Sequence, residues 1–474
     1  MISLSLQKLI AVLNAECLGP IEPASAIDGL TIDSRTIRPG QAFFALKGER
    51  FDGHDFAAEV ANKAAACIVA ERRPALPSDN TTPVLLVPSV LGALATLAGW
   101  YRHELSAYVI AITGSAGKTT TRHILHHVLS RFYRCHQAVK SFNNHIGVPL
   151  SILGTPPDCQ VLLLELGSNH PGEIEPLARL AEPNAACITL IGPAHLEGFG
   201  NMQNILVEKT SIAKGLKADG VLYVNGDQPA LAGFAKTLGC RVKTFGTTVG
   251  CDIIGTDLIA NGLTGQLRID GKTVDVPLPG RANLMNVLTV WSICRDLKIE
   301  LSDFSEAVKT VSPVPMRLAV ETIGRITLLN DCYNANPASM SNALETLSRL
   351  AGQTKQRAVF IAGSMAELGK QAEQLHYQLG RQAATAGVGC LLACGPFARA
   401  IIDGGRETGM AEADCHFFVD TTQLCDKLHL FIRPDDIILV KGSRVNGLEA
   451  AVETLKQLNP TTQDKAHPKQ KIPN

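Results

Sequence analysis

Apolar runs alternate with helical patterns along most of the chain, and this alternation restarts once. The first series begins near residue 106, and the second follows Ser312-Pro313-Val314-Pro315. Each run precedes a loop and apolar positions at helical spacing, which predicts mostly parallel sheets covered by helices. The predicted strands are Tyr108–Thr113, Val161–Leu166, Ala185–Ile191 and Val221–Asn225 in the first series, and Ile326–Leu329, Ala358–Ala362, Cys390–Ala393 and Ile437–Val440 in the second.

The pattern divides the 474 residues into three predicted α/β domains. Residues 1–105 mix short strands and helices and predict a small mixed α/β domain. Residues 106–312 predict a central P-loop domain with a parallel sheet, and residues 313–474 predict a C-terminal Rossmann-like domain. The leucines of residues 1–20 predict an amphipathic opening helix rather than a signal peptide, because no basic segment precedes them. Residues 461–474 are polar and predict a frayed tail.

The composition excludes several classes of protein. Hydrophobic residues make up 46% and charged residues 19%, which is typical of a chain that buries large cores. Lys+Arg and Asp+Glu both number 44, so no net field attracts nucleic acid or an anionic membrane. No apolar run approaches the roughly 18 residues of a membrane span. The thirteen scattered cysteines include no CxxC pair and predict reduced thiols in a cytoplasmic protein.

A shortened phosphate-binding loop follows the predicted strand Tyr108–Thr113. Glycines allow backbone N–H groups to surround phosphates, and the following helix, predicted over Thr119–Leu129, adds a partial positive charge. Lys118 is expected to reach the β- and γ-phosphates, with the Thr119 hydroxyl on Mg²⁺. Ile112 stands where the strict motif has a glycine. The predicted ATP-binding residues of the loop are Gly114, Ser115, Ala116, Gly117, Lys118, Thr119 and Thr120.

The same helix carries His123, His126 and His127. Two of them, at i and i+4, have the spacing of a shared metal site. No glutamate of the zincin type lies between them, so a solvated polar helix face is the favoured interpretation.

Two loops after apolar strands supply further candidates for metal chemistry. Glu165 ends one predicted strand and His195 follows another, at the edge where open α/β sheets bind ligands. Either residue alone is more typical of a structural polar group. Together with Thr119 they predict an Mg²⁺ site, since Mg²⁺ accepts carboxylate and hydroxyl oxygens. A histidine ligand suits a second metal that bridges ATP and a substrate carboxylate.

These motifs together resemble the Mur ligase family, and within it the members that add D-alanyl-D-alanine. The segment Tyr333–Asn336 is characteristic of those members, and the Asp-Asn-Pro-Arg motif of the diaminopimelate-adding relatives is missing. The matching segments cover nearly the whole chain: Asp33–Arg35, Gly48–Phe56, Gly114–Thr120, Phe142–Gly147, Glu165–Glu173, Ala194–Phe199, Asp331–Pro337, Met365–Gly369 and Val440–Arg444.

The resemblance implies a three-domain, cytoplasmic, monomeric enzyme of peptidoglycan synthesis. The first domain is expected to hold the UDP end of UDP-N-acetylmuramoyl-tripeptide and the central domain ATP and Mg²⁺. The third domain is expected to close over the nucleotide and bind the incoming dipeptide. The implied reaction forms an acyl phosphate from ATP and the tripeptide carboxylate, and the amine of D-alanyl-D-alanine then displaces phosphate.

The resemblance also assigns roles to single residues. Lys118, Glu165, His195 and Lys209 are the implied catalytic residues, and Lys209 matches a lysine that is carbamylated in the family. An ordinary surface lysine is the alternative for Lys209. The implied nucleotide contacts beyond the loop are Asn283, Asn286, Arg317 and Asp331, and the implied substrate contacts are Ser34, Arg35, Asn143, Asn144, Tyr333 and Asn336.

Three positions depart from the family pattern, with Ala282 in place of histidine, Met316 of glycine and Ser364 of aspartate. We expect altered packing around the nucleotide rather than loss of catalysis. For Asn283, the alternative to an adenine contact is the N-cap of a helix over Leu284–Cys294.

Three other functions stay open at this point. A different amino-acid-adding member of the family would share most of these motifs. A P-loop kinase or switch protein would share Gly114–Thr119 but would not need the Asp33–Arg35 domain. A nucleotide-binding relative without catalysis would retain the fold and carry the three departures.

Overall fold

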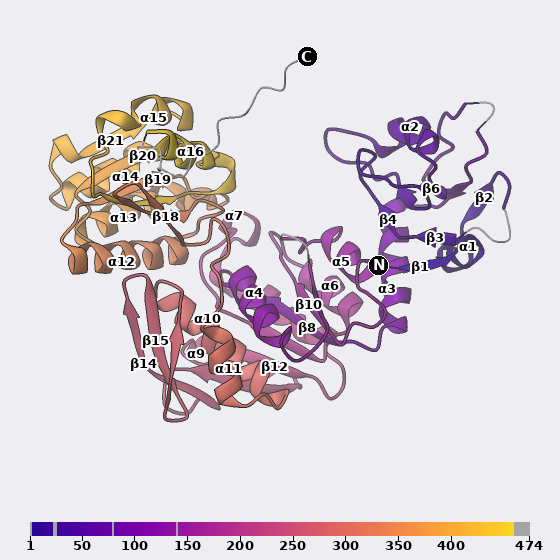
Figure 1. Ribbon diagram of the computed structural model, residues 1–474, viewed down its shortest axis with the longest axis horizontal. Helices are drawn as coiled ribbons and strands as arrows, with labels where there is room; N and C mark the ends of the chain where they lie inside the picture. Colours follow the sequence, from indigo (N-terminus) through magenta and orange to yellow (C-terminus); the bar gives the residue numbers. More distant parts are fainter. Residues whose placement is uncertain (1, 22–25, 78–79, 139–140, 459–474) are drawn as a thin grey trace, which may run out of the picture.

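A computed structural model describes residues 2–21, 26–77, 80–138 and 141–458. It consists of three α/β bodies, as the sequence predicts (Figure 1). In this view both outer bodies lie above the central one, the N-terminal body at the right and the C-terminal body at the left. The predicted tail, residues 461–474, falls outside the described residues. Among the described helices, none has the length and apolar character needed to cross a membrane.

The N-terminal body is built on a five-stranded sheet of order β2-β7-β6-β5-β4. The opening helix is shorter than predicted, because Asn14 adopts a left-handed conformation (φ 48°) that ends it, and Leu18 lies on a strand. The elements are β1 (Ser3–Ser5), α1 (Leu6–Leu13), β2 (Glu16–Leu18), β3 (Ala26–Asp28), β4 (Leu30–Thr31), β5 (Ala42–Phe44), α2 (Ala57–Asn62), β6 (Cys67–Ala70), β7 (Val84–Leu86) and α3 (Val90–Glu104).

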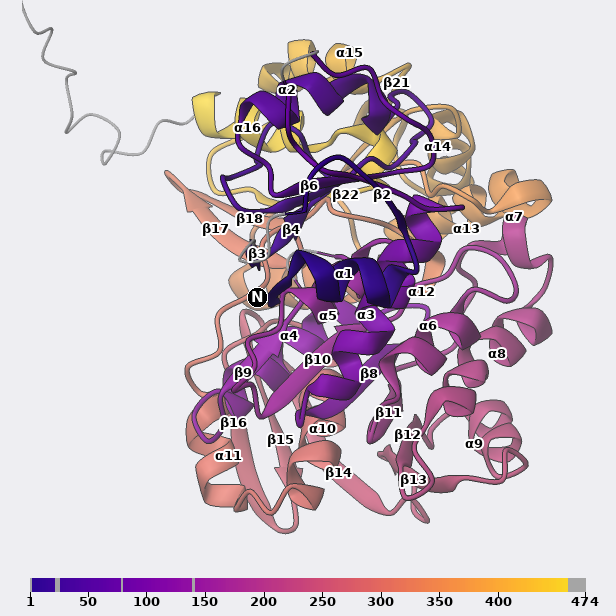
Figure 2. The ribbon, with the colours of Figure 1, turned by 90° about the vertical axis from the view of Figure 1, so that its right-hand side faces the viewer.

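Helix α3 attaches this body to the central one, where it lies beside α5 (Gly147–Leu153) and α6 (Ile174–Ala181) (Figure 2). The Tyr101 hydroxyl on α3 donates to the carbonyl of Thr155 at 2.7 Å. The buried Arg102 donates from Nε to the carbonyl of Ala181 at 2.7 Å. The two bodies therefore share a core as well as hydrogen bonds.

The central body has a nine-stranded sheet of order β16-β15-β14-β13-β12-β11-β8-β10-β9. Its strands are β8 (Tyr108–Thr113), β9 (Cys135–Gln137), β10 (Val161–Glu165), β11 (Ala185–Ile188), β12 (Val221–Asn225), β13 (Arg241–Gly246), β14 (Ile253–Asn261), β15 (Thr264–Ile269) and β16 (Lys272–Val276). Strands β8 to β14 pair in parallel, while β14, β15 and β16 form an antiparallel meander. The remaining helices are α4 (Lys118–Leu129), α7 (Leu196–Phe199), α8 (Met202–Thr210), α9 (Pro229–Ala235), α10 (Arg281–Asp296) and α11 (Leu301–Val308).

Strand β8 lies between β10 and β11, so the carboxyl ends of three parallel strands meet where the strand order reverses. Open α/β sheets bind ligands at such a point. Strand β11 is shorter than predicted and ends at Ile188, although the N–H of Thr189 still donates to the Thr113 carbonyl at 3.0 Å. The hydroxyl of Thr189 donates to the carbonyl of Ala116 in the phosphate loop at 2.5 Å.

The C-terminal body has a six-stranded sheet of order β17-β18-β22-β19-β20-β21, parallel except for β17. Each predicted strand is present and extends one or two residues further at its carboxyl end. The elements are β17 (Ala319–Ile323), β18 (Ile326–Asp331), α12 (Pro337–Thr354), β19 (Ala358–Gly363), α13 (Ala372–Thr385), β20 (Cys390–Cys394), α14 (Ala398–Glu407), β21 (Cys415–Phe418), α15 (Thr421–Lys427), β22 (Ile437–Lys441) and α16 (Glu449–Leu458).

The segment between α11 and β17 is bound to helix α4, which begins at the phosphate loop. His123 donates from Nε2 to the Ser312 carbonyl at 2.9 Å, and Arg131 donates to the Thr310 hydroxyl at 2.8 Å. His127 contacts the same hydroxyl at 2.9 Å. The prediction of a solvated histidine face is therefore wrong, because the histidines are half-buried and two of them bond to this segment.

Candidate active site

A cavity of about 610 Å³ opens between the central and C-terminal bodies. The phosphate loop and the carboxyl end of β10 form one wall, and loops of the C-terminal body form the other. Predicted site residues in its lining are Ser115, Ala116, Gly117, Lys118, Thr119, Thr120, Asn143, Asn144, Glu165, His195, Arg317, Tyr333 and Asn336. The fold thus gathers residues that lie more than 200 positions apart.

The phosphate loop needs both of its glycines. Gly114 has a φ of +142°, and a Cβ there would lie 2.1 Å from the Thr189 hydroxyl oxygen. Gly117 has a φ of +86° and immediately precedes α4. The N-terminal turn of α4 therefore presents unpaired N–H groups to the cavity, as phosphate sites require.

Lys118 lies across this loop, with Nζ donating to the Gly114 carbonyl at 2.7 Å. Burial lowers the pKa of Lys118, and the carboxylate of Glu165 partly opposes that shift.

Glu165 ends β10 and is only 2% exposed. Its Oε2 accepts from the Thr119 hydroxyl at 2.9 Å, and its Oε1 accepts from Asn143 Nδ2 at 2.8 Å. Arg122 Nε lies 3.6 Å from Oε2. Within the part of the chain that is described, no three His, Cys, Asp or Glu side chains form a metal cluster. A hydroxyl and a carboxylate nevertheless fit Mg²⁺, which prefers oxygen ligands and keeps several waters.

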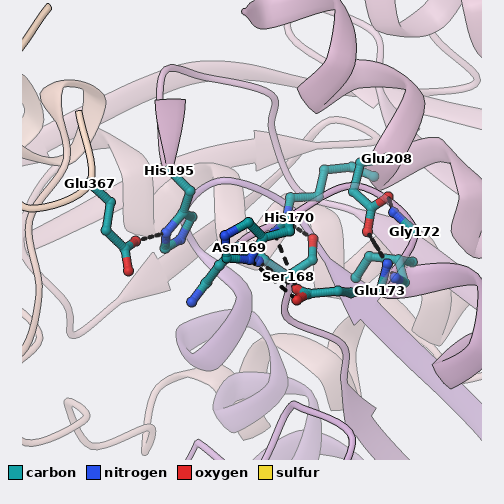
Figure 3. A network of polar contacts seen from close by, with 10 residues as sticks. Ser168, Asn169, His170, Gly172, Glu173, His195, Glu208 and Glu367 are labelled. Atoms are coloured by element: carbon teal, nitrogen blue, oxygen red, sulfur yellow. Dashed lines mark hydrogen bonds and ion pairs between the residues drawn. The ribbon is translucent and has the colours of Figure 1, made fainter. Parts of the chain in front are cut away.

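His195 lies at the start of α7 in a left-handed conformation (φ 54°). Its ring lines the same cavity, but Nδ1 contacts Glu367 of the C-terminal body rather than Thr119 or Glu165 (Figure 3). Burial lowers the pKa of His195, and Glu367 opposes this shift.

Lys209 is 1% exposed, so the alternative of an ordinary surface lysine is wrong. Its Nζ donates to the Ser168 hydroxyl at 2.7 Å and to the Ser168 carbonyl at 3.2 Å. Burial, followed by the charge of Lys118, lowers the pKa of Lys209 to about 7. Burial therefore favours the neutral form of this amine over the charged one.

Glu208, next to Lys209 on α8, holds the loop between β10 and α6. Its carboxylate accepts from the backbone N–H groups of Gly172, Glu173 and Ile174 at 2.7, 3.1 and 2.8 Å (Figure 3). Adjacent residues of one helix thus bind both ends of a loop that lines the cavity. No sequence pattern marked Glu208, because its partners are backbone groups 34–36 positions earlier.

The opposite wall carries two arginines against one tyrosine. The guanidinium carbons of Arg317 and Arg444 lie 4.3 and 5.8 Å from the centre of the Tyr333 ring. Met316, which replaces a family glycine, adopts the left-handed φ of +58° that a glycine would favour. Arg444 ends the Val440–Arg444 motif, to which the sequence analysis assigned no role.

Three predicted nucleotide contacts are bonded to their own neighbours, outside the lining of the cavity. Asn283 donates to the Pro279 carbonyl at 2.7 Å, and Asn286 donates to Asn283 at 3.3 Å. Asp331 accepts from the buried Lys441 ammonium at 2.6 Å.

The N-cap alternative for Asn283 is wrong. Helix α10 begins two residues earlier, at Arg281, and its N-cap is Gly280, so Asn283 lies in the first turn.

The remaining predicted substrate residues lie in two places. Ser34 and Arg35 belong to the N-terminal body, where Arg35 forms a bidentate pair with Asp33 at 2.7 and 2.8 Å. Asn144 lines the cavity and accepts from the backbone of Gly147 at 2.9 Å, which fixes the start of α5.

Three family models match successive parts of the chain. They are the Mur ligase family, catalytic domain over residues 26–100, the Mur ligase middle domain over 112–294, and the Mur ligase, glutamate ligase domain over 316–444. UDP-N-acetylmuramoyl-tripeptide–D-alanyl-D-alanine ligase of Escherichia coli is 34% identical, with 96% of this chain and 99% of that protein covered. The enzyme of the same name from Bacillus subtilis is 32% identical over the same shares.

The chain belongs to the Mur ligase family.

Solved structures of the Mur ligase family agree over the whole fold. A crystal structure of MurF from Acinetobacter baumannii has a TM-score of 0.86 at 28% identity and covers 96% of this chain and 99% of that one. MurF ligase from Thermotoga maritima in complex with ADP has a TM-score of 0.80 at 27% identity, covering 92% and 98%.

Proposed function

We propose that this chain joins D-alanyl-D-alanine to UDP-N-acetylmuramoyl-tripeptide at the expense of ATP. The observation that carries the proposal is the cavity between the two bodies. Lys118 and the Thr119–Glu165 pair face it from one side, and Arg317 and Tyr333 face it from the other. The names of the relatives supply the two substrates.

The proposed reaction has two steps. A carboxylate oxygen of the tripeptide attacks the γ-phosphorus of ATP, the bond to the β–γ bridging oxygen breaks, and ADP leaves. The amine nitrogen of the dipeptide then attacks the carbonyl carbon of the acyl phosphate. The carbon–oxygen bond to phosphate breaks, the nitrogen loses a proton, and the products are an amide and inorganic phosphate.

The residues of the phosphate wall are suited to the first step. The N–H groups of the loop and the ammonium of Lys118 would stabilise charge on the transferring oxygens. Thr119 and Glu165 would hold Mg²⁺, with His195 as a further ligand, and bound Mg²⁺ neutralises phosphate charge. Arg317 would face the same charge from the C-terminal body.

Lys209 would act as a carbamate in this proposal. Only a neutral amine reacts with CO₂, and the lowered pKa of Lys209 keeps much of it neutral. The product would carry a negative charge in place of a positive one, within electrostatic reach of Lys118 and His195.

The outlying residues complete the hypothesis. Ser34 and Arg35 would bind the UDP end, while Asn283, Asn286 and Asp331 would bind adenosine once their present hydrogen bonds rearrange. We place the reaction in the cytoplasm and expect a monomer.

Phosphate release, measured with each substrate withheld in turn, tests the function. We expect release that requires ATP, UDP-N-acetylmuramoyl-tripeptide and D-alanyl-D-alanine together. Equal release without the dipeptide would favour a switch protein, and no release under any condition would favour a non-catalytic relative. The control for another amino-acid-adding activity replaces both substrates. Diaminopimelate takes the place of D-alanyl-D-alanine, and the UDP-linked dipeptide takes the place of the UDP-linked tripeptide.

A further inference from the structure

Two contacts join Glu367 to the start of helix α7. Its carboxylate contacts His195 Nδ1, and its carbonyl accepts from the backbone of Glu197 at 3.0 Å. Figure 3 shows the glutamate reaching the imidazole from the C-terminal body. The two residues are 172 positions apart and meet only because the two bodies are docked.

The loop that carries Glu367 is fixed on its own side. The Met365 N–H donates to the buried His376 ring at 2.7 Å, and the Ala366 N–H donates to the Ser443 hydroxyl at 2.7 Å. Leu368 is buried beneath the loop. The carboxylate is therefore presented by a rigid support rather than by a free surface loop.

The backbone of this loop approaches α7 closely. Glu367 has a φ of +60° and Gly369 a φ of +55°. A Cβ on Gly369 would lie 3.2 Å from the Cα of Glu197. This close approach explains a glycine at the end of the Met365–Gly369 motif, to which the sequence gave no role.

We propose that Glu367 is a positioning residue for His195, a role that the proposed function does not include. The inference rests on that proposed function. A carboxylate only accepts, so the imidazole hydrogen is held on Nδ1 and the lone pair lies on Nε2. Carboxylates fix metal-binding histidines in this way in many proteins. Here the carboxylate comes from a different body, so the bias toward the ligand-ready tautomer depends on the docking of the C-terminal body.

The tautomer is measurable without activity. In metal-free protein labelled with ¹⁵N-histidine, two-bond ¹H–¹⁵N spectra distinguish a protonated ring nitrogen from a bare one, and His195→Gln identifies the signal. We expect hydrogen on Nδ1 in the parent, loss of that state in Glu367→Ala and retention in Glu367→Gln, whose amide oxygen still accepts. Glu373→Ala is the matched control, because Glu373 is exposed on the first turn of α13. An unchanged His195 signal in Glu367→Ala would overturn the proposal.

A double-mutant cycle supplies the kinetic arm. Glu367→Ala should lower kcat by about 10–100-fold, as loss of such a partner commonly does. The double variant with His195→Ala should be no slower than His195→Ala alone, because Glu367 acts through the imidazole. Losses that multiply would contradict this role. A parent without ligase activity would refute the proposed function, whereas the spectra test Glu367 independently.

Discussion

The side chain of Asn336 donates from Nδ2 to the carbonyl of Ser115 at 3.1 Å, across the boundary between the C-terminal body and the phosphate loop. The same side chain accepts from the Ser339 N–H at 2.9 Å and caps helix α12. One amide therefore starts a helix and contacts the loop predicted to hold ATP. Its two functions depend on different atoms, so they can be separated.

Asn336→Ser should raise the Michaelis constant for ATP by about 2–10-fold, the effect of one net hydrogen bond. Serine is also a good N-cap, so the melting temperature should stay close to that of the parent. Asn336→Ala is the comparison, since it loses both bonds and should also melt lower. Equal ATP dependence in the serine variant and the parent would remove Asn336 from nucleotide binding.

Lys118→Ala should reduce ligation by about 10²–10³-fold, because a preorganised charge facing the transferring phosphoryl group is lost. Lys370→Ala, at an exposed lysine of the C-terminal body, is the charge control and should leave turnover unchanged. Circular dichroism melting checks the fold of both variants. Near-normal turnover of Lys118→Ala would remove the lysine from the mechanism.

Glu165→Gln should raise the Mg²⁺ concentration for half-maximal activity by about 10-fold, which corresponds to about 1.4 kcal/mol of binding. The amide keeps an acceptor for Thr119 but loses the charge that a divalent cation favours. Glu373→Gln is the matched control, because that carboxylate is exposed on the first turn of α13. Superimposable Mg²⁺ titrations of Glu165→Gln and the parent would make Glu165 purely structural.

Turnover should depend on dissolved CO₂ if Lys209 is carbamylated. We expect activity to fall by about 10–100-fold in CO₂-free buffer and to return when bicarbonate is added. Lys209→Arg should be slow and unresponsive to bicarbonate, because a guanidinium stays protonated and does not form a carbamate. A parent enzyme that is indifferent to bicarbonate would argue that Lys209 acts as an amine.

Lys209 should also shape the pH dependence of stability in CO₂-free buffer. Its pKa is about 7 in the folded chain and 10.5 for an ordinary lysine, so between these values the unfolded chain holds the extra proton. The free energy of unfolding therefore rises with pH between these two values. Below the folded-state pKa, the destabilisation caused by burying the charged lysine is complete. Lys209→Met should melt higher than the parent, most at pH 6 and least near pH 10.5. A difference that does not change with pH would contradict the lowered pKa.

The sequence predicted well those features that depend on residues close together along the chain. The eight predicted strands, the phosphate loop and the placement of Glu165 at the end of β10 depend on nearby residues, and each is found, although the sequence did not predict β9, β13 to β17 or β21. Errors arose at the ends of elements, as at β11, which stops at Ile188 just before the Thr189 hydroxyl that donates to Ala116 in the phosphate loop. Helix α10 begins at Arg281, earlier than predicted, and its N-cap Gly280 has no side chain that could mark this start in the sequence.

The candidate site was predictable only in part, for the same reason. Motifs identified the central-body residues, but not the pairing of His195 with Glu367 or the loop held by Glu208. Such pairs join distant segments, and one sequence carries no signal for them. Burial likewise excludes the surface-lysine alternative for Lys209, which the sequence alone left open.

The bonds from His123, His127 and Arg131 to the segment after α11 bear on how the molecule could move. That segment connects the central body to the C-terminal body along the chain, and it is hydrogen-bonded to the helix whose first turn faces the cavity. If the C-terminal body rotates, helix α4 would hold the segment about which it turns. A nucleotide bound at the first turn of α4 would then act on that segment through the same helix.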